Sequence, residues 1–410
     1  MSGTVAHIPR RFVADAWGGT ERLISESARE LAHRGLASRV LTTRIMCTGA
    51  AENFDGLAVE RHPHFYPIWP LDPARRAGLD RKGGNVVSFA LARALARVPE
   101  LSIVHMHTGN RLAAQALAVA RRRRVPCVIS LHGGHFAIPA AEHADLVAGG
   151  AARARALDWG RALSWWWGTR SLLERVDAVI CVGHEEHQAA TARLPRQRVH
   201  FLPGAVDVDA FARGDRARGR AALGVDAARE LVLAVSRLDR QKDLATLVRA
   251  WAAAGRPGCD LALVGSETTP GYADELRSLA AGAAGRLVLP GNIAAAQVPD
   301  LLAAADLSVL PSRHEPFGLA IVESWAAGTA VIGAAVGGPA WLLAGETCGR
   351  LFAPGDHDAL RALIVELLDH PQRRRALAAA GQRRATGEFT WRHHVDRLLA
   401  IYAEAGMRVY

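Results

Sequence analysis

Short apolar runs alternate along the whole chain with longer stretches in which apolar residues recur every three or four positions. The short runs predict buried strands and the longer stretches predict amphipathic helices, an alternation typical of parallel βαβ units. The expected strands of the first half are residues 4–8, 38–43, 101–105, 126–131 and 177–182. The pattern then restarts, with expected strands at 231–236, 260–265, 286–289, 306–310 and 330–334. We therefore predict an α/β protein with two doubly wound, Rossmann-like sheets.

The length of 410 residues exceeds what one hydrophobic core usually holds, so two domains are expected. Residues 202–220 contain Pro203, Gly204, Gly214 and Gly219 and show no clear periodicity, which favours a domain link there. After Pro371 the chain is rich in Arg and Ala and helical in pattern. We predict an N-terminal domain of residues 1–205, a C-terminal domain of residues 206–385 and a terminal helix in residues 386–410 that returns to the first domain.

Composition narrows the class of protein. Half of the residues are hydrophobic and 22% are charged, which is typical of a globular fold. The net charge of +10 suits nucleic acid, an anionic membrane or phosphate-bearing substrates, but the arginines are spread along the chain, so charge alone does not decide. Five cysteines without a CxxC pair argue against disulfides and structural zinc, and favour buried free thiols.

No apolar run reaches the roughly 18 residues of a spanning helix. Arg10, Arg11 and Asp15 interrupt what would be the apolar centre of a signal peptide. We therefore expect a cytoplasmic protein. Peripheral contact with the inner face of a membrane is an alternative that these observations do not exclude.

The most informative stretch is residues 311–323, directly after the expected strand 306–310. Pro316 and Gly318 predict a tight turn into a helix at 319–327. The first amides of that helix, those of Gly318, Leu319 and Ala320, would point outward and favour a diphosphate. Ligands of open α/β sheets bind at such strand ends.

Two glutamates, Glu315 in the loop and Glu323 inside the helix, are separated by seven residues. Such pairs recur by chance and usually cap or solvate a helix. The strand, turn and helix around this pair favour a ligand site instead, in which one carboxylate meets a sugar and the other a ribose.

This stretch resembles the E-x7-E signature of glycosyltransferase family 4, whose members are retaining enzymes with the GT-B fold, and the similarity covers nearly the whole chain. The resemblance implies two Rossmann-like domains facing a central cleft. It implies that the nucleotide-sugar donor binds to the second domain and that the acceptor enters from the first.

Residues 236–243 follow the first strand of the second domain and resemble the family's Arg and Lys pair that grips the donor diphosphate. We assign these roles to Arg237 and to Lys242, one of only two lysines in the chain. A guanidinium fork and a compact ammonium can together neutralise a departing diphosphate. Without the neighbouring motif, this would be an ordinary basic surface loop.

Other strand-end loops gain meaning only from the resemblance. Gly265 and Ile293 stand in two loops like those that meet the nucleotide base. Gly18 and Gly19 stand in a loop like the family's glycine-rich loop, which approaches phosphate or acceptor closely. His132 matches the active-site histidine that faces the donor sugar. The segment 203–211 resembles the family's P-x-G-V-D-x-x-x-F, although Ala205 replaces its glycine.

Three stretches suggest a metal and are set aside. Asp207 and Asp209 form a DxD, but in the link segment. Residues 184–187 lack the i, i+4 histidine spacing of HExxH, and no clear third ligand accompanies either that stretch or the pair of His105 and His107. We expect no essential metal.

Trp165, Trp166 and Trp167 suit a membrane interface, stacking on an acceptor sugar, or helix packing. Their role stays open at this point.

We predict a retaining glycosyltransferase that moves a hexose-type sugar from a UDP or GDP donor to a hydroxyl acceptor, in glycan, glycolipid or glycosylated-metabolite biosynthesis. It would need neither metal nor cofactor and would not bind nucleic acid. The expected catalytic residues are Glu315, His132, Arg237 and Lys242. The alternatives are a GT-B-fold sugar-nucleotide epimerase and, from another class, a basic protein that binds nucleic acid or membranes.

Overall fold

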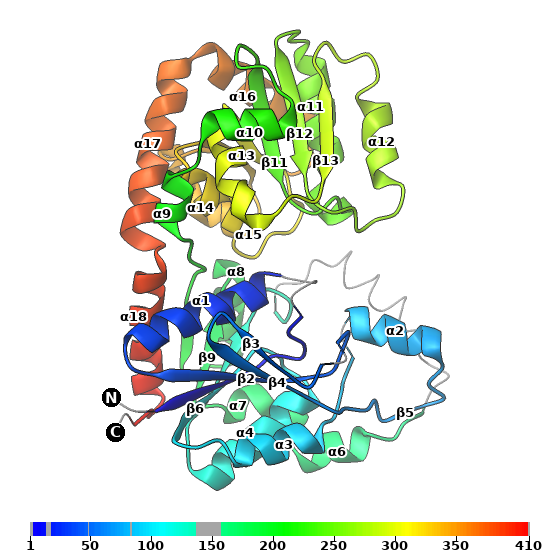
Figure 1. Cartoon of the computed structure of the whole chain (residues 1–410), viewed down its shortest axis with the longest axis vertical. Coiled ribbons are helices and arrows are strands. Elements are labelled where there is room, and N and C mark those ends of the chain that lie inside the picture. The colour runs from blue at the N-terminus through cyan, green and yellow to red at the C-terminus, as the bar shows by residue number, and fades with distance from the viewer. Residues whose placement is uncertain (1–2, 14–17, 48, 83, 137–156, 409–410) are drawn as a thin grey trace. The chain divides into compact units, whose positions relative to one another are not determined.

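The computed structural model describes residues 3–13, 18–47, 49–82, 84–136 and 157–408. The chain divides into two compact units (Figure 1). The N-terminal unit consists of Met1–Pro203 and His394–Tyr410, and the C-terminal unit of Gly204–His393. In its described residues no helix is long and apolar enough to cross a membrane.

The N-terminal unit is built on an eight-stranded sheet of order β10-β9-β7-β6-β1-β2-β4-β3. All neighbouring strands are parallel except β3 and β4, which form an antiparallel hairpin. The strands are β1 (Thr4–Ile8), β2 (Ala37–Thr43), β3 (Ala51–Phe54), β4 (Leu57–His62), β6 (Leu101–Met106), β7 (Cys127–Leu131), β9 (Ala178–Cys181) and β10 (Val199–Phe201). Because helices cover both faces, β1, β6 and β7 are buried throughout.

Different helices cover the two faces of this sheet. On one face pack α3 (Phe89–Ala96), α4 (Arg111–Arg123), α7 (Leu172–Arg175) and α8 (His184–Arg193). On the other face pack α1 (Gly19–His33) and α18 (Trp391–Glu404). At the side of the unit lie α2 (Pro73–Lys82), α6 (Arg161–Trp166), the 3-10 turn η2 (Thr169–Ser171) and the short antiparallel pair of β5 (Ile68–Trp69) and β8 (Leu157–Asp158).

The C-terminal unit has a fully parallel six-stranded sheet of order β13-β12-β11-β14-β15-β16. Chain order reverses between β11 and β14, and ligands of such sheets bind in the crevice beyond the carboxyl ends there. The strands are β11 (Glu230–Val235), β12 (Cys259–Val264), β13 (Leu287–Gly291), β14 (Leu307–Leu310), β15 (Ala330–Ala334) and β16 (Arg350–Phe352).

Two layers of helices enclose this second sheet. One layer contains α11 (Leu244–Ala254), α12 (Tyr272–Leu279) and α16 (His357–Asp369). The other contains α9 (Val208–Ala212), α10 (Arg216–Leu223), α13 (Val298–Ala304), α14 (Leu319–Ala326) and α15 (Gly337–Leu342). Helix α17 (Pro371–Glu388) contributes to both, and the 3-10 turns are η3 (Arg240–Lys242), η4 (Ala295–Gln297) and η5 (Ala344–Glu346).

All ten strands expected from the sequence are present, with ends shifted by at most two residues. The sequence analysis missed six strands: β3, β4, β5, β8, β10 and β16. They are two to six residues long, and their apolar runs are too short to stand out. Four cysteines are buried free thiols and Cys47 is partly exposed, so the prediction of unpaired cysteines is confirmed.

The chain passes from the first unit to the second between Pro203 and Gly204, within the link expected at residues 202–220. The expectation that this segment lacks periodic structure is wrong, because α9 and α10 occupy most of it. Asp207 and Asp215 cap these helices by accepting hydrogen bonds from the amides of Ala210 and Arg218. A Cβ on Gly219 would lie 2.0 Å from the carbonyl oxygen of Asp300 in α13. The glycine therefore serves close helix packing, and the DxD aspartate at 207 serves as a helix cap.

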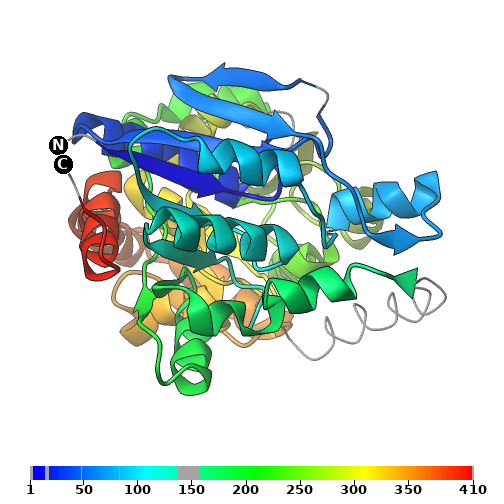
Figure 2. The ribbon, with the colours of Figure 1, turned by 90° about the horizontal axis from the view of Figure 1, so that it is seen from below.

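The terminal helix α18 packs on the N-terminal sheet, where Val395, Leu398 and Tyr402 join the core around Val5 (Figure 2). His394 Nδ1 lies 2.9 Å from the carbonyl oxygen of Pro203. The predicted boundary at residue 386 falls inside the last turn of α17, which continues to Glu388. The change between units comes instead at residues 393 and 394.

Candidate functional site

Four neighbouring strands of the C-terminal unit end beside one another, and each is followed by residues that the sequence analysis selected. Ile293 follows β13, Gly265 follows β12, Arg237 follows β11 and Glu315 follows β14. Parallel strands direct their carboxyl ends to the same edge of a sheet. The sheet order therefore gathers residues that are up to 78 positions apart, 237 to 315, at one edge.

A mostly buried ion pair stands at this edge. Lys242 Nζ lies 2.7 Å from Glu315 Oε2, and the two side chains are 17% and 15% exposed. Removing one partner of such a pair leaves a poorly solvated charge, which costs more than an exposed ion pair contributes. Two of the four residues predicted to be catalytic are thus in direct contact.

Two further contacts fasten the loop of Lys242 to the loop of Glu315. The amide of Arg313 donates to the carbonyl oxygen of Gln241 at 2.9 Å, and Arg313 Nε donates to Asp243 Oδ2 at 3.0 Å. Asp243 is buried, has a left-handed backbone with φ of +47°, and accepts a hydrogen bond from Thr246 Oγ1 at 2.9 Å. Aspartate tolerates that conformation better than most residues.

The sequence analysis missed both Arg313 and Asp243. Asp243 stands directly before the apolar residues 244–254, a position typical of a helix N-cap. Nothing in the neighbouring sequence indicated that its partner would be Arg313, 70 residues away.

The turn before α14 has the geometry expected for anion binding. Gly318 has φ of +94° and precedes an eight-residue helix, whose first amides have no partner within the helix. Backbone amides and the helix dipole at such an end favour negative charge. Leu319 and Ala320 therefore stand where the sequence analysis placed them.

Gly338 of α15 holds this turn in place and was missed. Its amide donates to the carbonyl oxygen of Glu315 at 2.8 Å. A Cβ at this position would lie 1.9 Å from the carbonyl oxygen of Phe317, which is backbone that cannot give way. Because Gly338 has no side chain, α15 can lie close enough to the turn for this hydrogen bond to hold the backbone of Glu315. Glu323, inside α14, is 8% exposed.

Arg237 is on the same edge but is not part of the ion pair. Its side chain is 53% exposed and its Nη1 lies 3.5 Å from Asp239 Oδ2. The neighbouring amide of Leu238 donates to the carbonyl oxygen of Ser266 at 2.9 Å, so the loops after β11 and β12 are joined. Arg237 therefore has an exposed guanidinium beside the pair's loop.

Gly265 occupies a position that excludes a side chain. Its φ is +149°, and a Cβ there would lie 2.1 Å from the carbonyl oxygen of Ser236. Its amide donates to the carbonyl oxygen of Gly291 at 2.9 Å, which joins the ends of β12 and β13. Ile293 is partly buried against the core of this unit.

The glycine-rich loop of the N-terminal unit opens α1. The amide of Gly18 donates to Glu21 Oε2 at 3.2 Å, whereas a Cβ on Gly19 would meet nothing within 4 Å. The buried carboxylate of Glu21 thus already occupies part of this helix end. The two residues before Gly18, Ala16 and Trp17, lie outside the described residues.

His132 ends a row of imidazoles at the carboxyl ends of β1, β6 and β7. His7 Nδ1 lies 3.2 Å from His107 Nε2, and His107 Nδ1 lies 3.4 Å from His132 Nε2. Burial lowers the pKa of His7 and of His132 to about 4, and that of His107 well below its usual value. Near neutral pH these rings are uncharged, and each link consists of one donor and one acceptor nitrogen.

The statement that His105 and His107 lack a third metal ligand is wrong. His7 is the third, and ligand atoms of the three rings lie within 4.8 Å of one another. The sequence analysis missed His7 because it lies about 100 residues before His105 and comes close only through the pairing of β1 with β6. However, His105 Nδ1 lies 2.7 Å from Tyr402 Oη and its Nε2 lies 2.7 Å from Ser130 Oγ. Three imidazoles can bind a transition-metal dication, but here a metal would have to replace one of these two hydrogen bonds of His105.

The loop after His132 is anchored by a buried carboxylate. Glu186 of α8 accepts hydrogen bonds from the amides of Gly133 at 2.7 Å and His135 at 2.9 Å. Glu186 belongs to the stretch 184–187 that was set aside as a metal motif. Its carboxylate binds backbone amides instead, a role that the sequence analysis did not foresee.

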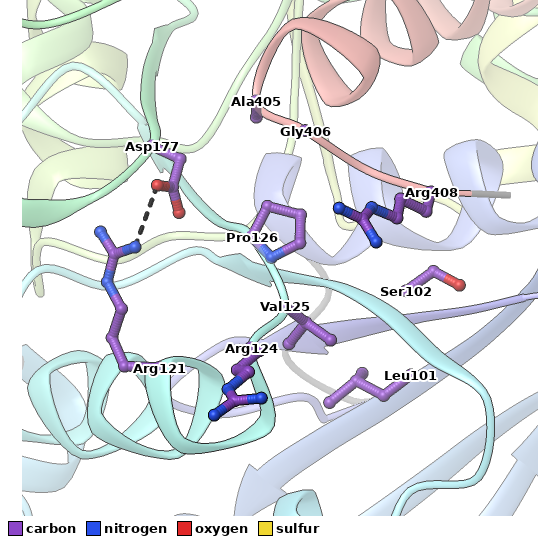
Figure 3. A pocket seen from close by; sticks show the side chains of 10 residues that line it. All are labelled: Leu101, Ser102, Arg121, Arg124, Val125, Pro126, Asp177, Ala405, Gly406 and Arg408. Carbon is purple, nitrogen blue, oxygen red and sulfur yellow. Dashed lines mark ion pairs between the residues drawn. The ribbon is translucent and has the colours of Figure 1, made fainter.

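A separate cavity of about 510 Å³ lies at the opposite edge of the N-terminal sheet (Figure 3). It is lined near the start of β6 by Leu101 and Ser102 and at the end of α4 by Arg121 and Arg124. Arg121 Nη1 is paired with Asp177 Oδ1 at 3.2 Å. Because parallel strands begin here, this cavity is at the far edge of the sheet from His132.

Both halves of the chain match known family models. The model for Glycosyltransferase Family 4 matches residues 17–210, and the model for group 1 glycosyl transferases matches residues 215–384. The D-inositol 3-phosphate glycosyltransferase of Mycolicibacterium smegmatis is 32% identical over 408 residues, which cover 95% of this chain and 86% of that protein.

The chain belongs to glycosyltransferase family 4.

It is an enzyme that transfers a sugar from a nucleotide-sugar donor, and it has the GT-B fold. The alpha-maltose-1-phosphate synthase of M. smegmatis is 29% identical over 420 residues, covering 97% of this chain and 98% of that protein. Anabaena HepE, solved in complex with UDP, matches the fold with a TM-score of 0.72 at 19% identity, over 98% of this chain and 99% of that one. These findings do not favour the epimerase alternative.

Proposed function

We propose that this family 4 enzyme transfers a hexose-type sugar from a UDP or GDP donor to an acceptor hydroxyl with retention of configuration, and that it needs neither metal nor other cofactor. The observation that carries the proposal is the Lys242–Glu315 pair beside the open start of α14. A cation, a carboxylate and unpaired amides at one sheet edge are the groups that an anionic leaving group and a developing sugar cation require.

The donor diphosphate is assigned to the first amides of α14, with Lys242 and Arg237 supplying positive charge. The bond between the anomeric carbon and the diphosphate oxygen breaks, and its electron pair goes to that oxygen. The acceptor hydroxyl attacks the resulting oxocarbenium-like carbon from the same face. Its proton passes to the leaving phosphate oxygen. The helix amides and both cations stabilise the negative charge that develops on the diphosphate as the bond breaks.

Glu315 is assigned to orient the donor sugar and to support its developing positive charge. In the structure Lys242 already neutralises this carboxylate. A bound diphosphate would compete for the same ammonium and would leave Glu315 freer to face the sugar. Glu323 is assigned to the ribose hydroxyls, and the loops of Gly265 and Ile293 to the base.

On the N-terminal unit we assign His132 to the donor sugar, and Gly18 and Gly19 to phosphate or acceptor, as the family resemblance implies. A partly buried, neutral imidazole can donate or accept one hydrogen bond to a sugar hydroxyl without bringing a charge.

The name of one relative contains D-inositol 3-phosphate, and HepE has been solved with UDP-glucose. These names favour a UDP-hexose as the first donor to test, and a small polyol that carries phosphate as the first acceptor.

A panel of UDP and GDP sugars tests the proposal. Thermal shift and slow release of nucleoside diphosphate should both identify one preferred donor. Anomeric coupling constants in the product should match the donor configuration, and EDTA should leave the rate unchanged. Binding of no donor would overturn the site assignment, an inverted product would overturn retention, and loss of activity in EDTA would overturn metal independence.

A further inference from the structure

Large apolar side chains are exposed along one part of the N-terminal unit. Trp165 is 82% exposed, Trp166 77%, Trp69 71% and Leu157 68%. Phe89 and Trp159 are also half exposed. Tryptophan is usually well buried, so several exposed rings on neighbouring elements mark an interaction surface.

These side chains belong to β5, β8, α3 and α6 and to the residue that follows β8, and contacts join several of them. Trp69 and Leu157 are directly paired across the β5–β8 ladder. Ring contacts run from Trp159 to Phe65, whose centroids are 5.9 Å apart, from Phe65 to Phe89 at 6.0 Å, and from Phe89 to Trp167 at 6.2 Å. We call this surface the aromatic patch: Phe65, Trp69, Phe89, Leu157, Trp159, Trp165, Trp166 and Trp167.

Two exposed arginines stand beside the patch. A cavity of about 640 Å³ is lined by Arg161, Trp165 and Arg170 together with the hydroxyl groups of Ser164 and Thr169. Neither arginine forms an ion pair with any residue that the structure describes. The nearby carboxylate of Asp158 forms an ion pair with the buried Arg111, with 2.6 Å between Asp158 Oδ2 and Arg111 Nη2. The cavity therefore places two guanidinium groups and hydroxyl donors next to exposed indoles.

This combination matches the surface of an anionic bilayer. Indole rings favour the headgroup region, where their apolar body and polar N–H are both accommodated. Arginine guanidinium groups bind phosphate oxygens in pairs and gain from the negative surface potential. A protein partner would have to match the apolar rings, whereas a fluid lipid surface adapts to them.

We propose that the aromatic patch docks on an anionic phospholipid bilayer, with Trp165 and Trp166 entering the headgroup region and Arg161 and Arg170 binding lipid phosphates. The docking surface belongs to the N-terminal unit, separate from the donor loops of the C-terminal unit. It is therefore independent of the proposed sugar chemistry, and each can fail alone.

Flotation of the full-length chain with vesicles tests the proposal. Vesicles of phosphatidylcholine with phosphatidylglycerol should carry the protein upward, and pure phosphatidylcholine vesicles should carry much less. Trp165→Ala with Trp166→Ala should reduce binding at least about tenfold. The double variant Arg161→Gln with Arg170→Gln should bind anionic vesicles more weakly, with the affinity falling about fivefold for each arginine removed.

Matched controls lie outside the patch. Arg213→Gln changes an exposed arginine of the C-terminal unit, and Met46→Ala removes an apolar side chain that is 47% exposed. Both should bind vesicles like the parent chain. Unchanged thermal unfolding of the tryptophan variant would show that it is folded.

Equal binding by the tryptophan variant and the parent, or no binding to anionic vesicles by the parent, would overturn the proposal. Displacement from vesicles by millimolar glycerol phosphate at constant ionic strength would assign the cavity to a free phosphate instead. Self-association that disappears in the tryptophan variant, without vesicle binding, would assign the patch to a second copy of the chain.

Discussion

The two units hold their selected residues in different ways. In the C-terminal unit, the loops of Lys242 and Glu315 are joined by an ion pair and by two bonds from Arg313. In the N-terminal unit, His132 is the end of a row of neutral imidazoles whose members hydrogen-bond to one another. The first arrangement concentrates charge where a diphosphate is expected, and the second excludes charge. Changes in the C-terminal loops should therefore act on turnover, and changes in the histidine row should act more on stability and orientation.

The largest expected effect is on turnover. Glu315→Gln keeps the size of the side chain but removes the charge, and we expect kcat to fall by about 100- to 1000-fold. The variant should stay folded but unfold at a lower temperature, because Lys242 keeps a hydrogen bond to the amide oxygen but loses its counter-ion. Initial rates with the preferred donor measure the effect. A variant with parental turnover would remove Glu315 from the mechanism.

Gly338→Ala tests whether backbone packing holds the site. The new methyl group would meet the carbonyl of Phe317, and we expect a loss of about 2 to 4 kcal/mol in unfolding free energy together with weaker donor binding. Gly345→Ala is a control on the next turn, where a Cβ would meet nothing within 4 Å, although its positive φ adds some strain. Similar losses in both variants would mean that strain rather than this close approach matters.

The histidine row predicts a pH dependence of stability. The pKa of His7 and that of His132 are lowered to about 4 by burial, whereas in the unfolded chain histidine titrates near 6.5. The unfolded state then binds more protons below about pH 6.5, so the free energy of unfolding should fall as pH drops from there toward 4, by up to about 3 kcal/mol for each such histidine. Denaturant unfolding across this range measures it. His7→Asn should flatten the curve, and an unchanged slope would contradict the assignment.

The smallest expected effect separates orientation from chemistry. His107→Leu removes the hydrogen bond behind His132, and we expect kcat to fall about tenfold, in the range of one lost neutral hydrogen bond, with little change in KM for the donor. His107→Asn should restore part of the rate if hydrogen bonding to His132 is what matters. Equal rates for His107→Leu and His107→Asn would show that His107 contributes by packing and not by its hydrogen bond to His132.

Local pattern was sufficient for much of the fold. Apolar runs such as residues 231–235 predicted ten strands, and the turn at Gly318 predicted the start of α14. Short or half-exposed strands such as β3 and β5 escaped, since pairing partners rather than their own residues stabilise them. The helices α9 and α10 escaped because glycines that serve helix packing look like link residues in sequence.

By itself, the sequence determined the alternation of strands and helices, the family signature and the candidate residues Glu315, Lys242, Arg237 and His132, because these depend on neighbours along the chain. Tertiary structure alone decided that Asp243 holds Arg313, that His7 stands behind His107 and that Trp69 faces Leu157. Each of those pairs joins strands or loops far apart in sequence, and only sheet order and register bring their side chains within a few ångströms.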